Sequence, residues 1–150
     1  MKAFVLSISL VFLLAGVCFC QSAPNDVSLC LLQKSVREGE QQTVRVSGVF
    51  STGFEYSLLD DAACPEESTW VDLKLKSRRN EKKLQKHLHN SGKVFLVAEG
   101  EFFGPVPPDP SWPQDIRDNY PVGWGWLNCR TMLVVHALIE VKLVPREPEQ

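Results

Sequence analysis

The sequence lacks the short motifs by which many enzymes are recognised. It has no phosphate-binding P-loop, no dinucleotide-binding glycine fingerprint, no His-Glu-x-x-His zinc motif and no Gly-x-Ser-x-Gly nucleophile turn. It also lacks an excess of charge: 16 basic and 18 acidic side chains in 150 residues exclude a chain-wide polycation. No repeat or low-complexity tract occurs, and a hydrophobic content of 44% excludes an intrinsically disordered chain. These absences leave one globular domain of undetermined chemistry.

The first twenty residues have the pattern of a secretory signal. Lys2 precedes an apolar run over residues 3–17, which is shorter than the roughly 20 residues of a membrane span. Cys18 and Cys20 put small side chains at the −3 and −1 positions of a cleavage before Gln21. We therefore expect residues 1–20 to be a signal peptide and the protein to be secreted or periplasmic. The alternatives are an uncleaved anchor or a lipoprotein modified at Cys18, and only these predict a membrane partner.

Hydrophobic periodicity in the remaining chain predicts a mainly β fold with two helices. The expected elements are a helix over 27–35, strands over 43–50, 54–59 and 71–75, a helix over 80–90 capped by Asn80, and strands over 94–103 and 133–143. Five strands with a helix between the third and fourth is the element order of the OB fold, a small Greek-key β-barrel. We expect one OB-like five-stranded barrel over residues 21–144, with a short N-terminal helix, and a disordered tail over 145–150.

Two of these elements also have predicted buried faces. In the first helix, Val27, Cys30 and Leu31 are expected on one face. In the last strand an apolar row alternates without a break, formed by Leu133, Val135, Ala137, Ile139, Val141 and Leu143. His136 lies on the opposite face of that strand, so a surface position is expected for it.

Several short motifs are spread over residues 27–144. They are Cys30-x-Leu32, V-R-V-S-G-V-F (44–50), G-F-E (53–55), L-L-D-D (58–61), Cys64, W-V-D-L (70–73) and W-G-W-L-N-C (124–129) before a V-V-H-A-L strand. Together they resemble a group of secreted bacterial proteins of uncharacterised function, thought to be OB-like and sometimes likened to nucleic-acid-binding OB domains. The resemblance implies the barrel and lends no chemistry.

Three cysteines follow the signal, namely Cys30, Cys64 and Cys129. In an oxidising compartment they predict one disulfide and one remaining thiol. Cys30 and Cys64 are expected at one end of the barrel and Cys129 at the other. Because a disulfide needs Cα atoms within about 7 Å, we predict a Cys30–Cys64 bridge, with three unpaired buried thiols as the alternative. No pair has the C-x-x-C spacing of a redox or zinc site. No cofactor is expected.

The connection over residues 104–128 is the leading candidate for a ligand site, because in OB-like barrels this loop borders the ligand face. Its predicted ligand-binding residues are Trp112, Tyr120, Trp124 and Trp126, stiffened by six prolines. Flat aromatic rings stack on sugars, bases or a partner's prolines; alternatively, the loop folds back and buries its own tryptophans. Acidic side chains in the loop disfavour phosphate, so a protein, peptide or glycan is expected rather than nucleic acid.

A second candidate is a basic segment over residues 74–89. Its cations are Lys74, Lys76, Arg78, Arg79, Lys82, Lys83 and Lys86, accompanied by His87 and His89. Such a patch is able to bind nucleic acid or an anionic surface, and the alternative is a solvated helix and strand edge.

No catalytic or metal-ligating residue is predicted. His87 and His89 are two apart on a predicted helix, so they point to different sides and cannot share a metal. The acidic pairs Asp60-Asp61 and Glu66-Glu67 lack the spacing of an EF-hand loop. We expect an exported, non-catalytic binding module; a small hydrolase with an unrecognised site is the further alternative.

Overall fold

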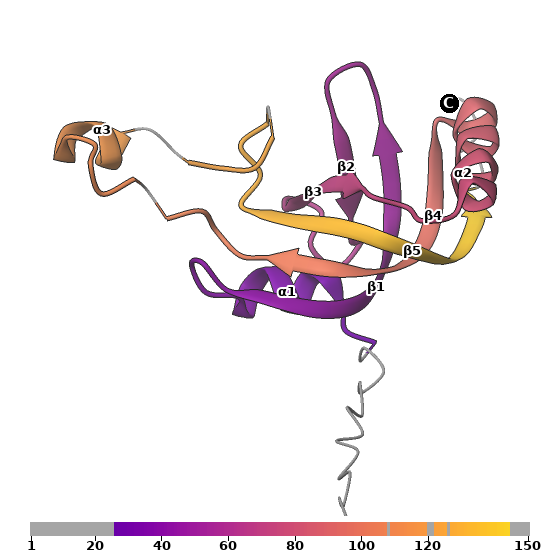
Figure 1. Cartoon of the computed structure of the whole chain (residues 1–150), viewed down its shortest axis with the longest axis horizontal. Helices are drawn as coiled ribbons and strands as arrows, with labels where there is room; N and C mark the ends of the chain where they lie inside the picture. The colour runs from indigo at the N-terminus through magenta and orange to yellow at the C-terminus, as the bar shows by residue number, and fades with distance from the viewer. Residues whose placement is uncertain (1–25, 108, 120–121, 126, 145–150) are drawn as a thin grey trace, which may run out of the picture.

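Five strands close into a barrel in the order β1-β2-β3-β5-β4 (Figure 1). The computed structural model describes residues 26–107, 109–119, 122–125 and 127–144, so the predicted signal peptide and tail lie outside the described residues. The strands are β1 (Gln41–Thr52), β2 (Ser57–Asp60), β3 (Ser68–Leu73), β4 (Lys93–Phe103) and β5 (Thr131–Leu143). All pairings are antiparallel except β3 with β5, which is parallel. The predicted OB-like barrel is confirmed.

The core is the inside of this barrel. Side chains alternate between the two faces of each strand, and the inward set is fully buried. Its largest members are Phe50, Leu59, Leu96, Phe102 and Leu133. β1 pairs with β4 over nearly its whole length and with β2 over its last four residues, so one long curved strand joins both halves of the barrel.

Helix α1 (Leu29–Ser35) covers one side of the barrel, and Leu29 and Leu32 enter the core. The predicted face was wrong for Leu31, which is 62% exposed. The helix buries Leu29, Cys30, Leu32 and Gln33, so Cys30 is buried as predicted, whereas position 31 lies outward. The predicted disulfide is confirmed: Cys30 and Cys64 are bonded, with Cα atoms 5.4 Å apart.

Helix α2 (Arg78–Ser91) lies between β3 and β4 and packs on the barrel through Leu84. The helix is capped by Ser77 instead of Asn80, because the Ser77 hydroxyl accepts a hydrogen bond from the Asn80 N–H at 3.4 Å. The Asn80 side chain instead donates to the Leu138 carbonyl at 3.4 Å. Gly92 ends the helix in the left-handed conformation, which glycine adopts without strain.

The predicted unbroken alternation in β5 was wrong. Its pairing with β4 shifts twice, between Val97 and Ala98 and between Glu99 and Gly100. Each shift leaves one extra residue on β5, so the apolar row changes face. As a result Leu138 is buried, whereas Ile139 is 51% exposed. Among the described residues, no helix is long and apolar enough to cross a bilayer.

Candidate functional site

The connection between β4 and β5 has two parts in different environments. Its distal part carries helix α3 (Gln114–Asn119) and projects away from the barrel (Figure 1). Trp112, just before α3, is 40% exposed, and Ile116 within α3 is 36% exposed. The basal part returns to the barrel before β5 begins. The connection therefore does not fold back onto the barrel along its whole length.

The two described aromatic residues of the predicted site lie in different parts of the connection. Trp112 belongs to the distal part and Trp124 to the basal part, while Tyr120 and Trp126 lie outside the described residues. Trp124 is half-buried: its ring centroid lies 5.8 Å from that of Phe103, and its Nε1–H donates to the Gly104 carbonyl at 3.0 Å. These contacts fasten the base of the loop to the end of β4.

An apolar stripe crosses the outer face of the barrel beneath this base. Its members are cross-strand neighbours, one from each of four adjacent strands: Leu58, Trp70, Met132 and Phe103. All four are half-buried. The prediction of site residues did not include them, although apolar side chains at the outward positions of alternating strands were a usable signal.

A tight turn lies across this stripe. Trp124 and Cys129 exchange two backbone hydrogen bonds, at 2.8 and 3.0 Å. Between them Gly125 has φ +64°, and a Cβ at this position would lie 2.2 Å from ring carbons of Trp70. The turn therefore rests on the Trp70 indole, and only glycine permits so close an approach.

A cleft of about 380 Å³ lies beside the stripe. It is lined by Leu58, Glu66, Glu67, Ser68, Leu127, Asn128, Cys129, Arg130 and Thr131. Leu127 is 57% exposed. Cys129 is a buried free thiol, and burial raises its pKa. It is therefore protonated near neutral pH and is a poor nucleophile.

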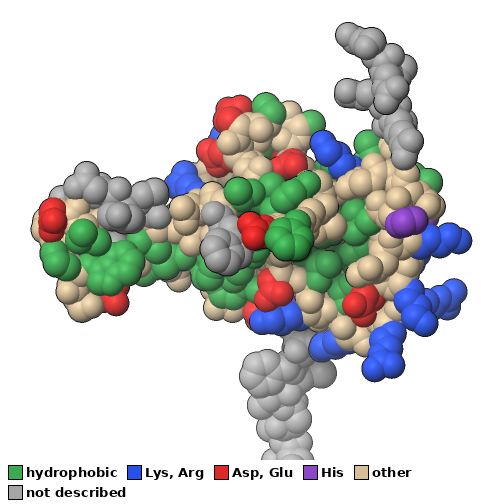
Figure 2. All heavy atoms as spheres, turned by 90° about the horizontal axis from the view of Figure 1, so that it is seen from above, with side chains coloured by type: hydrophobic (Ala, Val, Ile, Leu, Met, Phe, Trp, Pro, Cys, Tyr) green, Lys and Arg blue, Asp and Glu red, His purple; other side chains and the backbone are tan. Residues whose placement is uncertain are grey.

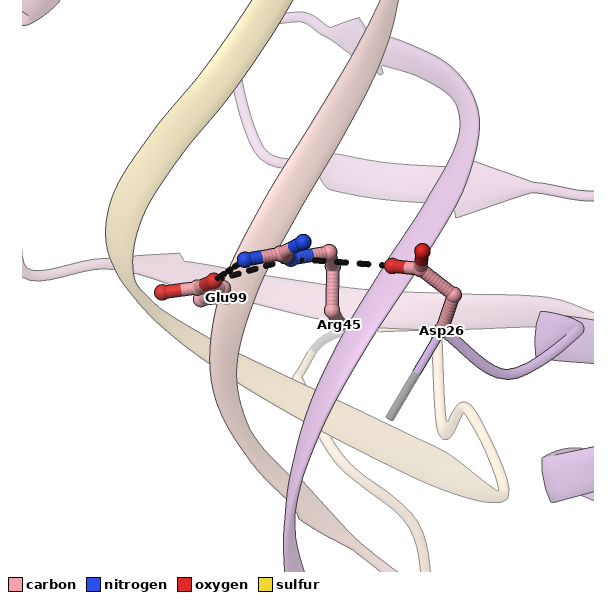
Figure 3. Close-up of polar contacts among 3 residues, drawn as sticks. All are labelled: Asp26, Arg45 and Glu99. Atoms are coloured by element: carbon pink, nitrogen blue, oxygen red, sulfur yellow. Dashed lines mark hydrogen bonds and ion pairs between the residues drawn. The ribbon is translucent and has the colours of Figure 1, made fainter. Parts of the chain in front are cut away.

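A polar cluster on the outer face of β1 and β4 holds the N-terminal end of the described chain (Figure 3). The Arg45 guanidinium donates from Nε to the Glu99 carboxylate at 2.8 Å and lies 3.6 Å from Asp26. The Val27 N–H donates to the Arg45 carbonyl at 3.0 Å. The hydrogen bond to Glu99 raises the pKa of Arg45 further. Because two carboxylates flank this cation, it is not available to a phosphate.

The basic segment lies at the other end of the molecule from α3. Within this segment Lys74 forms an ion pair with Asp72 at 3.3 Å. The other cations of the segment make no ion pair with any described residue. Figure 2 shows most of the Lys and Arg side chains visible from above gathered at the α2 end. In the part of the chain that the structure describes, no three His, Cys, Asp or Glu side chains are placed to hold a metal.

His136 lies on the surface, 3.7 Å from Glu101, and no nucleophile is placed beside it among the described contacts.

In comparisons with protein-family models, curated proteins and solved structures, the chain matched none.

Proposed function

We propose that the protein is an exported, non-catalytic binding module whose ligand occupies the cleft beside the apolar stripe. One observation carries this proposal: a row of apolar side chains crosses the outer face of the barrel from β2 to β4, and a cleft with an exposed leucine adjoins it. OB barrels use the β2 and β3 part of this face for ligands. The basal turn of the predicted loop forms one wall of this cleft. The proposal thus moves the centre of the site from the tryptophans to the surface on which Trp124 and Gly125 rest.

The chemistry of the cleft favours a peptide segment with apolar and basic side chains. Leu58 and Leu127 offer apolar contact, and Glu66 and Glu67 add carboxylates to the same lining. Arg130 is the one cation in that lining, so the carboxylates predominate. An anionic ligand would meet like charge here, whereas a lysine or arginine side chain would be attracted.

Export is supported by the covalent structure of the domain. The Cys30–Cys64 disulfide is of the kind that persists in oxidising compartments. The apolar run over residues 3–17 of the sequence has the length of a secretory signal.

Selection from a displayed library of random short peptides tests the proposal. The full oxidised chain is expected to enrich peptides that combine leucine-like or aromatic residues with lysine or arginine. Replacing Leu127 by Lys is expected to weaken the best peptide by about 30-fold, as at an interface hot spot.

The matched control is Leu31→Lys on α1, because Leu31 is 62% exposed and Leu127 57%. Equal loss in both variants, or full binding by Leu127→Lys, would contradict the proposed site. Enrichment of acidic peptides, or binding of glycans or oligonucleotides in place of peptides, would contradict the ligand class.

A further inference from the structure

Helix α2 presents a continuous basic face that the proposed function does not use. Arg78, Lys82 and Lys86 follow one another at four-residue steps, and Arg79 and Lys83 form a parallel row. All five side chains are exposed and make no ion pair with any described residue. The helix has a single acidic residue, Glu81.

The apolar side of the same helix is already occupied. Leu84, a member of the barrel core, and Leu88, packed against that core, lie on the stripe opposite the cations. Glu81 lies toward this side, where it lines a small cavity with Leu84 and Leu88. The basic face is therefore free of both apolar and acidic groups, and its interactions are electrostatic.

This face is the positive end of a molecule whose charge is unevenly distributed. The chain as a whole has a formal net charge of −2, yet eight of its 16 cations fall within residues 74–93, and Glu81 is the one acid there. Helix α3 and the projecting loop lie at the opposite end (Figures 1 and 2). If the α2 end of the protein bound to a surface, the projecting loop would therefore point away from that surface.

The shape and composition of the basic face favour a lipid surface over a nucleic acid. The cations stand on the convex side of a helix, and no described aromatic side chain lies among them to stack on a base. Clusters of four to eight lysines and arginines on such a helix are attracted to anionic headgroups, with a gain of about five-fold in partitioning per cation.

We propose that the basic face of α2 binds the surface of an anionic phospholipid bilayer, so that the α3 loop projects away from the membrane. This inference is independent of the peptide site, because the two surfaces share no residue. Binding by charge alone weakens steeply as salt rises, and it requires no insertion of the chain into the bilayer.

Co-sedimentation with vesicles tests this inference. The protein is expected to bind vesicles of phosphatidylcholine mixed with phosphatidylglycerol at low salt, and to ignore vesicles of phosphatidylcholine alone. The triple variant Lys82→Gln, Lys83→Gln, Lys86→Gln is expected to bind about 100-fold more weakly. A circular dichroism spectrum like that of the unmodified protein establishes that the variant is folded.

The control variant is Lys34→Gln, Arg37→Gln, Arg130→Gln, which removes the same charge from exposed positions outside α2. Equal loss in this control, binding to neutral vesicles, or insensitivity to salt would overturn the inference. So would binding of a DNA duplex through α2 without binding of the vesicles. The fluorescence that Trp112 contributes is obtained by comparison with Trp112→Phe. On vesicles this contribution is expected to stay quenchable by acrylamide, and protection would overturn the proposed orientation.

Discussion

Gly125 lies against the indole of Trp70, with backbone so close that a Cβ on Gly125 would come within 2.2 Å of the ring carbons. Trp70 is the β3 member of the apolar stripe, and Gly125 belongs to the turn before β5. This contact joins the loop to the strand face over 50 residues away in the sequence. The contact between Gly125 and Trp70 determines how far the turn lies from the barrel. It thereby positions Leu127, which lines the cleft.

Gly125→Ala is expected to displace the turn and destabilise the protein by about 1–3 kcal/mol, through the clash with Trp70 and the positive φ. The free energy of unfolding in urea measures the loss, and tryptophan fluorescence reports the displaced ring. Gly39→Ala separates the two causes, because Gly39 has φ +71° with nothing within 4 Å. Equal costs in the two variants would refute a role for the Trp70 contact.

Truncation of the two described tryptophans of the loop is expected to change stability by different amounts. Trp124→Ala removes the contact with Phe103 and the hydrogen bond to Gly104, and we expect a loss of about 2–3 kcal/mol in the free energy of unfolding. Trp112→Ala is expected to change stability by less than about 0.5 kcal/mol, because Trp112 lies on the projecting part. Chemical denaturation of both variants decides this. A large loss for Trp112→Ala would mean that the distal loop is held to the barrel.

Removal of the disulfide is expected to cost about 4 kcal/mol in the chain-entropy model, given a sequence separation of 34 residues. The double variant Cys30→Ser, Cys64→Ser provides the comparison, measured by urea unfolding. Thiol titration of the unmodified protein is expected to detect only Cys129 among the three cysteines of the domain, and only after unfolding, because that side chain is buried. Three reactive thiols after unfolding without reductant would contradict the bridge.

Stability is expected to fall in acid through Asp61. Its carboxylate accepts backbone hydrogen bonds from Ala63 at 2.9 Å and Cys30 at 3.1 Å, which lower its pKa, the bond from Ala63 most. A lowered folded-state pKa stabilises the fold above the unfolded value of about 3.9, and that stability is lost as pH falls through the folded value.

Asp61→Asn should therefore be less stable than the unmodified protein at neutral pH, and the two unfolding curves should converge in acid. The comparison is Glu38→Gln, since Glu38 is exposed and no hydrogen bond or ion pair involves it among the described contacts. A stability difference for Asp61→Asn that is independent of pH would contradict the assignment to the charged carboxylate.

The strands and helices of the barrel could be predicted from the sequence because they depend on local signals. Alternation of apolar residues marks each strand, and the position of one helix between the third and fourth strands indicates the OB-like order. The pairing of Cys30 with Cys64 was predicted from the barrel ends expected for the cysteines and is confirmed. The expected position of Cys129 at the opposite end was wrong, because β3 and β5 run parallel and Cys129 lines the same cleft as Glu66 and Glu67. Errors of a few residues in the predicted element boundaries do not change the predicted fold.

The details of the candidate site could not be predicted in the same way. The extra residues in β5 depend on how β4 bends around the barrel, and a pattern with period two contains no trace of a bulge. The burial of Trp124 depends on Phe103, and the cleft depends on Gly125 approaching Trp70, both of which are tertiary contacts. The pattern of aromatic residues in a proline-rich loop therefore did not indicate that Trp112 is exposed while Trp124 is half-buried.

Chemical-shift mapping of the isotopically labelled protein with a selected peptide tests the central claim most directly. Binding at the proposed site predicts that the perturbed backbone amides cluster at Leu58, Glu66–Trp70 and Leu127–Met132, with α2 unaffected. Perturbations confined to α2 or to the distal loop around Trp112, with the cleft unchanged, would contradict the assignment of this face as the ligand site.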